Sequence, residues 1–452
     1  MHTMKEDSRL MRHAFRLKRR DFLALAGSAT ALPLAAAVGP ATAAGGDSAR
    51  VPFAPGSTWG GWRKGHFQLH AIHTGAAESM FLIYPDGTTM LLDCGGHAAI
   101  NRGKLAVPVL PNGGRLAGEW VARYVARVNP NGRDVDYLVV SHFHSDHTGC
   151  EGFHAGRTVG RREDYFLSGL AQVAETIRFR KAIDRGWPDY DDPIPLDPSA
   201  DESSLGNTRK LFRHLVRRDG LKVEKFRVGA TDQLAPMRDP ATCPGFSVRN
   251  ICGNGRIARA DGTVRDLYAA RIARERPKEL NENGMSLGML FTYGGFRLYT
   301  AGDFSDGWQN PDGSRTDIET ELAKALPPVD VAKTNHHGYR ALPTPLVAAL
   351  RPRVWFSCVW DQLHDTADSL ARMADRAAYP GERLIAPGVF PAERRWEDLG
   401  KPFMKDIASE SFACGHMVFD VPPGGRDYTL TYLTADDESM RVTGAYRFQS
   451  RS

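Results

Sequence analysis

The pattern of apolar and polar residues predicts a chain in which short strands and helices are mixed. Apolar and polar side chains alternate at the start of the core, and the turn Pro85-Asp86-Gly87 joins two apolar runs into a hairpin. Apolar residues at helical spacing follow, and then a short β-branched run typical of a buried strand. These elements are predicted at residues 66–71 (strand), 80–84 and 90–93 (hairpin), 120–128 (helix) and 135–140 (strand).

A polar, irregular stretch over residues 155–280 divides this part from the rest, and its Pro, Gly and Asp clusters predict an insertion or lid. Regular patterns return after it. Strands are predicted at 285–292, 296–300, 327–333 and 353–357, and helices at 343–350 and 366–378. The last part, 380–452, is predicted to be a β-rich extension with strands at 416–421, 428–433 and 440–448.

The first 44 residues differ from the rest in charge and composition. They hold seven Lys or Arg and three Asp or Glu, so the remainder of this chain of net charge +5 is nearly neutral. Arg19-Arg20 precedes an uncharged stretch, rich in Ala, Leu and Gly, that ends in Ala41-Thr42-Ala43. This arrangement resembles a twin-arginine (Tat) signal peptide. We therefore expect export through the Tat route, a periplasmic or extracellular mature protein without stable membrane insertion, and a linker over 45–65.

The composition further limits the class of protein. With 42% hydrophobic and 25% charged residues among 452, the chain is an ordinary globular protein rather than a disordered or fibrous one. The nearly neutral remainder gives no strong signal for nucleic-acid binding. Six cysteines without a C-x-x-C pair are expected to be free, buried thiols. The oligomeric state is left open by the sequence.

The densest group of chemically active residues follows the predicted strand at 135–140. His142, His144, Asp146 and His147 form an H-x-H-x-D-H cluster. Nitrogen and oxygen donors at this density suit a divalent metal ion of borderline softness. From one tight loop, His142 and His144 can face one ion while Asp146 and His147 reach a second. The cluster therefore predicts a metal site.

More candidate ligands follow other predicted strands, and such strand ends are where sites of α/β proteins gather. Asp303, after Gly302, is the candidate bridging carboxylate, and His364 follows a later strand. Adjacent strand residues point in opposite directions, so only one of His336 and His337 is expected to bind metal. We place His337 in the metal site and His336 among the catalytic residues, and leave the reverse open. His66, His70 and His73 are expected to be structural.

The cluster and the turn Leu92-Asp93-Cys94-Gly95 before it resemble the metallo-β-lactamase superfamily. Within the superfamily, the chain is most similar to the hydrolase domain of ComEC-type DNA-uptake proteins and to phosphorylcholine esterases. The motifs that carry this similarity are Asn283-Gly284-Met285-Ser286-Leu287, Tyr293-Gly294-Gly295-Phe296, Thr300-Ala301-Gly302-Asp303, Lys333-Thr334-Asn335-His336-His337-Gly338 and residues 357–364. His144 stands where the DNA-uptake domains often have aspartate, and Tyr339 where serine is common, so a role in DNA uptake is not expected.

The resemblance covers about residues 66–378 and implies an α/β fold, the αββα sandwich, with a dinuclear, usually zinc, site between its sheets. It implies that His142, His144 and one of His336 or His337 hold the first ion. Asp146, His147 and His364 would hold the second ion, Asp303 would bridge the two, and Asp93 would orient the cluster loop. The hydrolase domain is accordingly expected over 66–379, with 155–280 as its insertion and 380–452 as its extension.

The predicted function is that of a metal-dependent hydrolase in which two divalent ions, zinc foremost with manganese or iron as alternatives, make water nucleophilic. Asp146 would orient this water and His336 would protonate the leaving group. The stretch 155–280 holds 24 Lys or Arg against 18 Asp or Glu, which favours an anionic substrate such as a phosphoester or phosphodiester, either a small molecule or an envelope ester. Lactonase or β-lactamase-type hydrolysis stays open, because the same site serves it. A non-enzymatic envelope-binding protein is a further alternative.

Overall fold

The computed structural model describes residues 56–75, 77–96, 108–149, 160–195 and 203–451, with two short strands at 153–154 and 157–158. The signal peptide expected over 1–44, most of the linker and Cys150 lie outside the described residues. In the part of the chain that is described, no helix has the length and apolar character needed to cross a membrane. All of the described residues belong to one compact unit, which spans Asp47–Ser452.

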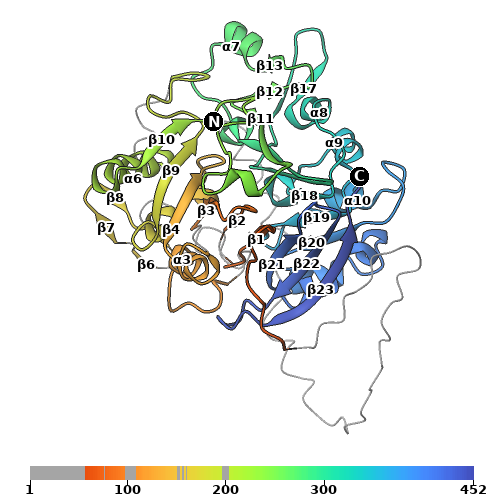
Figure 1. The fold of residues 1–452 in the computed structure, drawn as a ribbon. Coiled ribbons are helices and arrows are strands. Elements are labelled where there is room, and N and C mark those ends of the chain that lie inside the picture. The colour runs from red at the N-terminus through yellow and green to blue at the C-terminus, as the bar shows by residue number, and fades with distance from the viewer. Residues whose placement is uncertain are drawn as a thin grey trace, which may run out of the picture. The chain divides into compact units, whose positions relative to one another are not determined.

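Two mixed sheets form the centre of this unit (Figure 1). The first sheet has the spatial order β10 (Lys222–Lys225), β9 (Arg178–Asp184), β4 (Asp134–Val139), β3 (Thr89–Cys94), β2 (Ser79–Ile83), β1 (Phe67–Ala71), β21 (His416–Val421), β22 (Asp427–Leu433) and β23 (Val442–Gln449). The second has the order β13 (Val264–Asp266), β12 (Arg256–Ala258), β11 (Phe246–Gly253), β14 (Gly288–Tyr293), β15 (Phe296–Ala301), β18 (Val331–Lys333), β19 (Val354–Ser357) and β20 (Leu384–Pro387).

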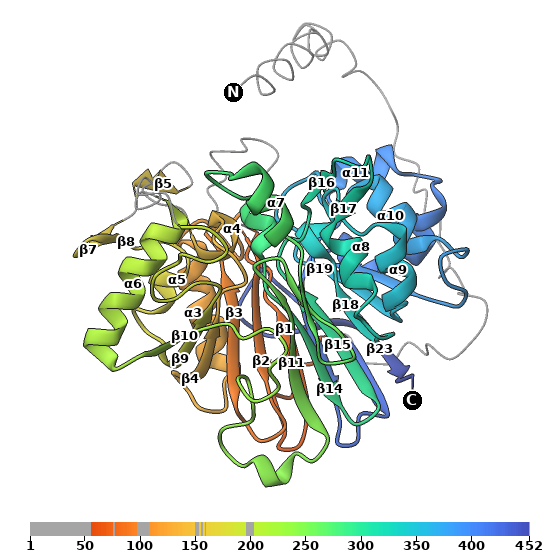
Figure 2. The same cartoon turned by 90° about the horizontal axis from the view of Figure 1, so that it is seen from above.

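Helices cover the outer face of each sheet, as Figure 2 shows. The first sheet packs against α3 (Ala117–Val128), α5 (Leu170–Val173) and α6 (Ser204–Asp219). The second packs against α8 (Ile318–Ala323), α9 (Thr344–Leu350) and α10 (Ala367–Ala374). The remaining elements are α4 (Ser145–Thr148), α7 (Ala269–Glu275), α11 (Ala392–Glu397), the 3-10 helices η3 (Pro240–Thr242), η4 (Glu282–Met285), η5 (Asn335–Gly338), η6 (Pro402–Asp406) and η7 (Ser409–Phe412), and the short hairpins β5 (Phe153–His154) with β6 (Arg157–Thr158), β7 (Arg161–Arg162) with β8 (Tyr165–Phe166), and β16 (Gly307–Gln309) with β17 (Arg315–Asp317).

Apolar side chains fill the space between the two sheets. Phe67 and Leu82 from the first sheet meet Phe291 and Leu298 from the second, all of them buried, and the rings of Phe67 and Phe291 stack with their centroids 5.8 Å apart. Every residue of β1, β2 and β3 is buried, because one face points into this layer and the other lies under α3 and its neighbours. The αββα sandwich expected from the sequence is confirmed.

The stretch 155–280 differs from the prediction of an insertion or lid. Its strands β9 and β10 extend the first sheet beyond β4, and β11, β12 and β13 extend the second beyond β14. The pattern of apolar residues did not reveal these strands, because some of them lie near sheet edges. There every second side chain is exposed and charged, as in Arg178-Phe179-Arg180. Within residues 380–452, β21 pairs with β1, and β22 and β23 follow it to the edge of the first sheet.

Three buried histidines, His70, His73 and His416, lie close together in the first sheet and the loop after β1. His70 Nδ1 is 3.0 Å from the hydroxyl of Tyr124, and the backbone N–H of His73 donates to His416 Nδ1 at 3.0 Å. Burial lowers the pKa of His70 and His416 to about 3 and that of His73 to about 4. These imidazoles are therefore neutral parts of the packed fold.

Acid should consequently destabilise the protein. Below about pH 6.5 these histidines are protonated in the unfolded chain but stay neutral in the folded protein. The free energy of unfolding therefore falls as the pH falls towards their folded-state pKa values. Replacing His70 by glutamine removes one such group. Between pH 6.5 and 5.5, the wild type should lose about 1 kcal/mol more than His70→Gln in urea unfolding of the metal-free protein. Equal losses would contradict this assignment.

Candidate metal centre

The H-x-H-x-D-H cluster lies on the loop and short helix that follow β4. Helix α4 begins at Ser145 and ends at Thr148, and it turns Asp146 and His147 back towards the strand ends. Asp93, at the end of β3, holds this loop: its carboxylate accepts hydrogen bonds from the Ser141 backbone N–H at 2.7 Å and from His147 Nδ1 at 2.8 Å. The contact that the resemblance implied for Asp93 is thus present.

Close backbone packing fixes the position of α4. The backbone N–H of Glu78, just before β2, donates to the carbonyl of Asp146 at 2.9 Å. Gly95 passes so near that a Cβ there would lie 1.9 Å from the same carbonyl oxygen. Only glycine allows this approach, which explains the Asp93-Cys94-Gly95 turn.

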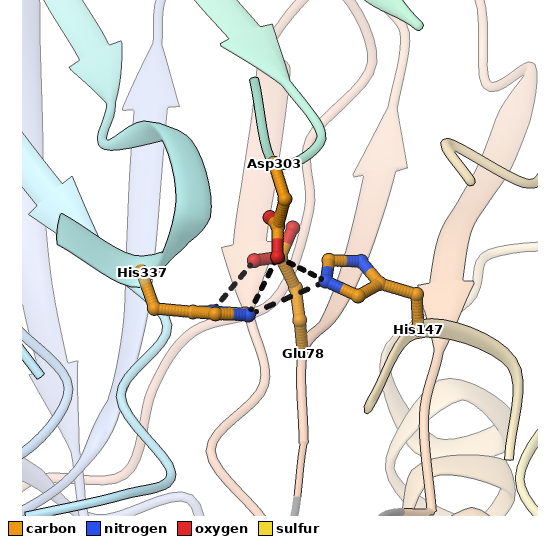
Figure 3. A group of neighbouring side chains, drawn as sticks. All are labelled: Glu78, His147, Asp303 and His337. Atoms are coloured by element: carbon orange, nitrogen blue, oxygen red, sulfur yellow. Dashed lines mark hydrogen bonds and ion pairs between the residues drawn. The ribbon is translucent and has the colours of Figure 1, made fainter. Parts of the chain in front are cut away.

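Four side chains from distant parts of the chain converge at the ends of the strands (Figure 3). Each offers one donor atom, and the four atoms lie within 4.8 Å of one another. Asp303 Oδ2 is 3.2 Å from His147 Nε2 and 3.2 Å from His337 Nε2, while the two imidazole nitrogens are 3.3 Å apart. The fourth residue is Glu78, whose Oε2 lies 3.3 Å from His337 Nδ1.

The hydrogen bonds around this group leave two nitrogen lone pairs facing each other. His147 Nδ1 donates to Asp93, and His337 Nδ1 donates to the backbone carbonyl of Cys358 at 2.8 Å. Both Nε2 atoms are then acceptors in the neutral rings. Two acceptors at 3.3 Å beside a carboxylate repel each other unless protons or metal ions are bound there. The donor set and its spacing therefore fit a cation.

The pKa shifts of the histidines in and around the cluster also fit a bound cation. Burial disfavours a charged ring at His337, yet the Asp303 carboxylate raises its pKa to about 10. Burial opposes the charge of His147 in the same way, and Asp303 again raises its pKa well above the ordinary value. Burial and the neighbouring imidazoles lower the pKa of His142 and His364, so these two rings are neutral and suited to bind a metal ion.

The other predicted site residues surround this group. His142 Nε2 lies 3.9 Å from Asp303 Oδ2 and 3.1 Å from His144 Nδ1. Asp146 Oδ2 lies 3.1 Å from His337 Nε2. His364 stacks on the ring of His337 with the centroids 4.9 Å apart. The structure thus brings all seven predicted ligands into one neighbourhood.

The side chains of His336 and His337 point to different groups, as expected from the sequence. The expected cause, alternation along a strand, is wrong. They do not continue a strand but lie in η5, where both have a left-handed φ, 48° and 51°. His337 is turned towards Asp303. His336 instead faces Asn283, whose Nδ2 lies 3.5 Å from His336 Nε2.

A cavity of about 250 Å³ opens beside the cluster. Its wall combines cluster residues with polar and aromatic side chains: His144, Ser145, Asp146, Asn283, Asp303, His336, His337, Tyr339, Trp360, Asp361, Leu363 and His364. No lysine or arginine is among these described lining residues. The positive excess of 155–280 is therefore not displayed on this wall.

One arginine of that stretch has a structural partner instead. Arg185, which is buried, binds Glu282 through both carboxylate oxygens at 2.7 Å, and Glu282 also accepts the backbone N–H of Phe143 at 3.0 Å. This pair supports the cluster loop from the side. Sequence reasoning gave neither residue a role.

Sequence reasoning also missed Glu78 and its partner Lys333. Lys333 Nζ lies 3.0 Å from Glu78 Oε2 and donates to the carbonyl of Ala301 at 2.8 Å. Both side chains are fully buried. Burial opposes the lysine charge, but Glu78 raises the pKa of Lys333. The pair joins the two sheets directly behind His337, and the only signal for it in the sequence is a single charge at the edge of each apolar strand.

Comparison with known proteins agrees with the geometry. Residues 73–150 match the family model of the metallo-beta-lactamase superfamily. This segment holds β2, β3, β4 and α4, and with them Glu78, Asp93 and the whole H-x-H-x-D-H cluster. No curated protein matches the chain. Over residues 73–150 the chain carries a domain of the metallo-beta-lactamase superfamily.

Proposed function

We propose that the protein is an exported dinuclear-metal hydrolase that cleaves a phosphoester or phosphodiester. The superfamily domain and the buried cluster of His, Asp and Glu indicate a metal-dependent hydrolase. The observation that carries the proposal is the convergence of His147 Nε2, His337 Nε2 and Asp303 Oδ2 within 3.3 Å beside a cavity. The twin arginines Arg19-Arg20 and the uncharged stretch after them support export through the Tat route.

The residues that would hold the metals are those brought together here. We assign His142, His144 and His337 to one ion, Asp146, His147 and His364 to the other, and Asp303 as the bridge. Asp303 fits this role because Oδ1 is buried without a partner among the described residues while Oδ2 faces both imidazoles. Bound divalent cations, with zinc the first expectation, would supply a water acidic enough to act as nucleophile near neutral pH and charge to stabilise the developing oxyanion.

Two side chains of the cavity wall serve the reaction itself. Burial opposes its charge, but His147 holds the pKa of Asp146 well below its ordinary value, so this carboxylate is ionised and orients the attacking water. His336 donates to the leaving-group oxygen. Its Nε2 accepts from Asn283, so the ring hydrogen is on Nδ1, a buried atom without a hydrogen-bond partner among the described residues. Burial lowers the pKa of His336, so near neutral pH the neutral ring would stabilise the leaving-group oxygen through a hydrogen bond.

A phosphoryl substrate suits this wall better than an acyl one. The ring of His336 and the hydroxyl of Tyr339 line the cavity and can donate hydrogen bonds to the oxygens of a phosphoester. The resemblance to phosphorylcholine esterases favours the same substrate class.

The test is hydrolysis of bis-p-nitrophenyl phosphate by the purified protein with zinc or manganese, before and after chelation. We expect turnover that disappears with the chelator and returns with added metal. A p-nitrophenyl ester and a lactone are assayed in parallel under the same conditions. Turnover of the lactone alone would replace the phosphoester proposal with lactone hydrolysis.

Changing His336 to alanine should slow the reaction without emptying the metal site. Loss of one hydrogen-bond donor to the leaving group lowers kcat about 10²-fold. The effect should be larger for an alkyl phosphodiester than for the p-nitrophenyl ester, since p-nitrophenolate needs little help to leave. Steady-state kinetics on both substrates, with metal content measured on the same sample, checks this. An equal loss on both substrates would argue against the leaving-group role.

A further inference from the structure

The loop from Asn335 to Leu342, which carries His336 and His337, has a strained backbone. His336, His337, Arg340 and Leu342 all have φ between 42° and 64°, at 48°, 51°, 52° and 63°. A residue other than glycine is strained in this left-handed region and persists there only where the surroundings impose it. Something outside the loop must therefore hold it in place.

Glu319, on α8, contacts both ends of this loop. Its Oε1 accepts a hydrogen bond from the Asn335 side-chain amide at 2.8 Å, and both oxygens lie 3.1 Å from the backbone nitrogen of Leu342. The hydroxyl of Tyr299 donates to the amide oxygen of Asn335 at 3.1 Å. One buried carboxyl group thus connects the residue before the two histidines with the end of the strained segment.

Glu319 is buried, and its side-chain hydrogen bonds go to the loop. Its side chain is only 3% exposed and lies beside apolar residues of α8 and α9. The charges of Asp317 and Arg372 act on it, but among the described contacts neither residue makes a hydrogen bond or ion pair with it. Arg372 instead donates to the carbonyl of Leu342 at 2.7 Å and so holds the same loop end. Burial raises the pKa of Glu319 to about 8, so near neutral pH its carboxyl group is largely uncharged. The hydrogen bonds that it accepts from Asn335 and Leu342 are what its buried position provides.

We propose that Glu319 is a positioning residue, which imposes the conformation of the 335–342 loop and thereby directs His337 Nε2 towards Asp303 and His147. This inference rests on the proposed metal site. Glu319 is not among the residues that line the cavity and touches neither histidine. Its effect should appear as the geometry of the metal centre, and not as a direct contact with substrate.

The test is zinc affinity of the full chain, measured by competition with a chromophoric chelator. Glu319→Ala should bind zinc about 10–100-fold more weakly, the range seen when an outer partner of a metal ligand is lost. Glu319→Gln keeps an oxygen that accepts from Asn335 and Leu342, and should remain within about threefold of the wild type. Glu321→Ala, on the same helix but paired with Arg265 and Lys324, is the matched control and should bind as the wild type does.

Urea unfolding of the same metal-free variants separates affinity from stability. Should Glu319→Ala not fold, Glu319→Asp gives the same information, since it retains the carboxyl group but withdraws the oxygens from the loop; we expect zinc binding about tenfold weaker. Wild-type zinc affinity in a folded Glu319→Ala or Glu319→Asp variant would overturn the inference. Absence of zinc binding by the wild type would instead overturn the proposed function, so the two failures are distinguishable.

Discussion

Changing His337 to alanine is expected to abolish metal-dependent hydrolysis and to release metal from the protein. His337 Nε2 lies within 3.3 Å of donor atoms from Asp146, His147 and Asp303, so its loss opens the centre of the cluster. Loss of several kcal/mol of metal-derived stabilisation corresponds to a fall of about 10³-fold in kcat/KM. Kinetics and metal analysis of the purified variant measure both effects.

The neighbouring histidine provides the matched control. His336→Ala changes the adjacent residue of the same loop, but His336 faces Asn283 and not the cluster. We expect this variant to keep the wild-type metal content. If His336→Ala lost metal while His337→Ala retained it, the two roles assigned here would have to be exchanged.

Changing Lys333 to methionine is expected to destabilise the fold strongly. Lys333, in β18, and Glu78, just before β2, form a fully buried ion pair at 3.0 Å. Removing one partner leaves an unpaired buried charge, which costs about 3–5 kcal/mol. Urea unfolding should show a loss of this size, and the metal site should weaken with it because Glu78 also faces His337 Nδ1 at 3.3 Å.

The double variant Lys333→Met with Glu78→Gln isolates the electrostatic part of this effect. It removes both charges while keeping similar side-chain volumes, so it should recover more than half of the stability lost in Lys333→Met. A double variant as unstable as the single one would show that the lysine acts through packing and its hydrogen bonds to backbone carbonyls.

Much of the fold could be predicted from the sequence because its central strands are buried on both faces. The hairpin of β2 and β3 and the strand β4 are continuous apolar runs, which leave little ambiguity. The strands of 155–280 escaped prediction for the opposite reason. In β9, Arg178 and Arg180 are exposed and the pairing with β4 supplies the order that the local pattern does not.

The candidate site divides in the same way. The H-x-H-x-D-H cluster could be recognised because its donors are adjacent in the chain, and Asp303 because glycine and a strand precede it. Glu78, Lys333 and Glu319 could not, since each is a single charge in an ordinary local sequence. Their significance comes from partners that the sheets bring together, such as Lys333 with Glu78 and Glu319 with Leu342.

The central claim is that the group formed by His147, Asp303 and His337 is a metal centre. Metal analysis of the purified full chain, dialysed against zinc and then against metal-free buffer, tests it most directly. We predict about two zinc ions per chain in the wild type, the number expected of a dinuclear site, and markedly less in His337→Ala. A folded wild-type protein that retains no zinc, manganese or iron would contradict the claim.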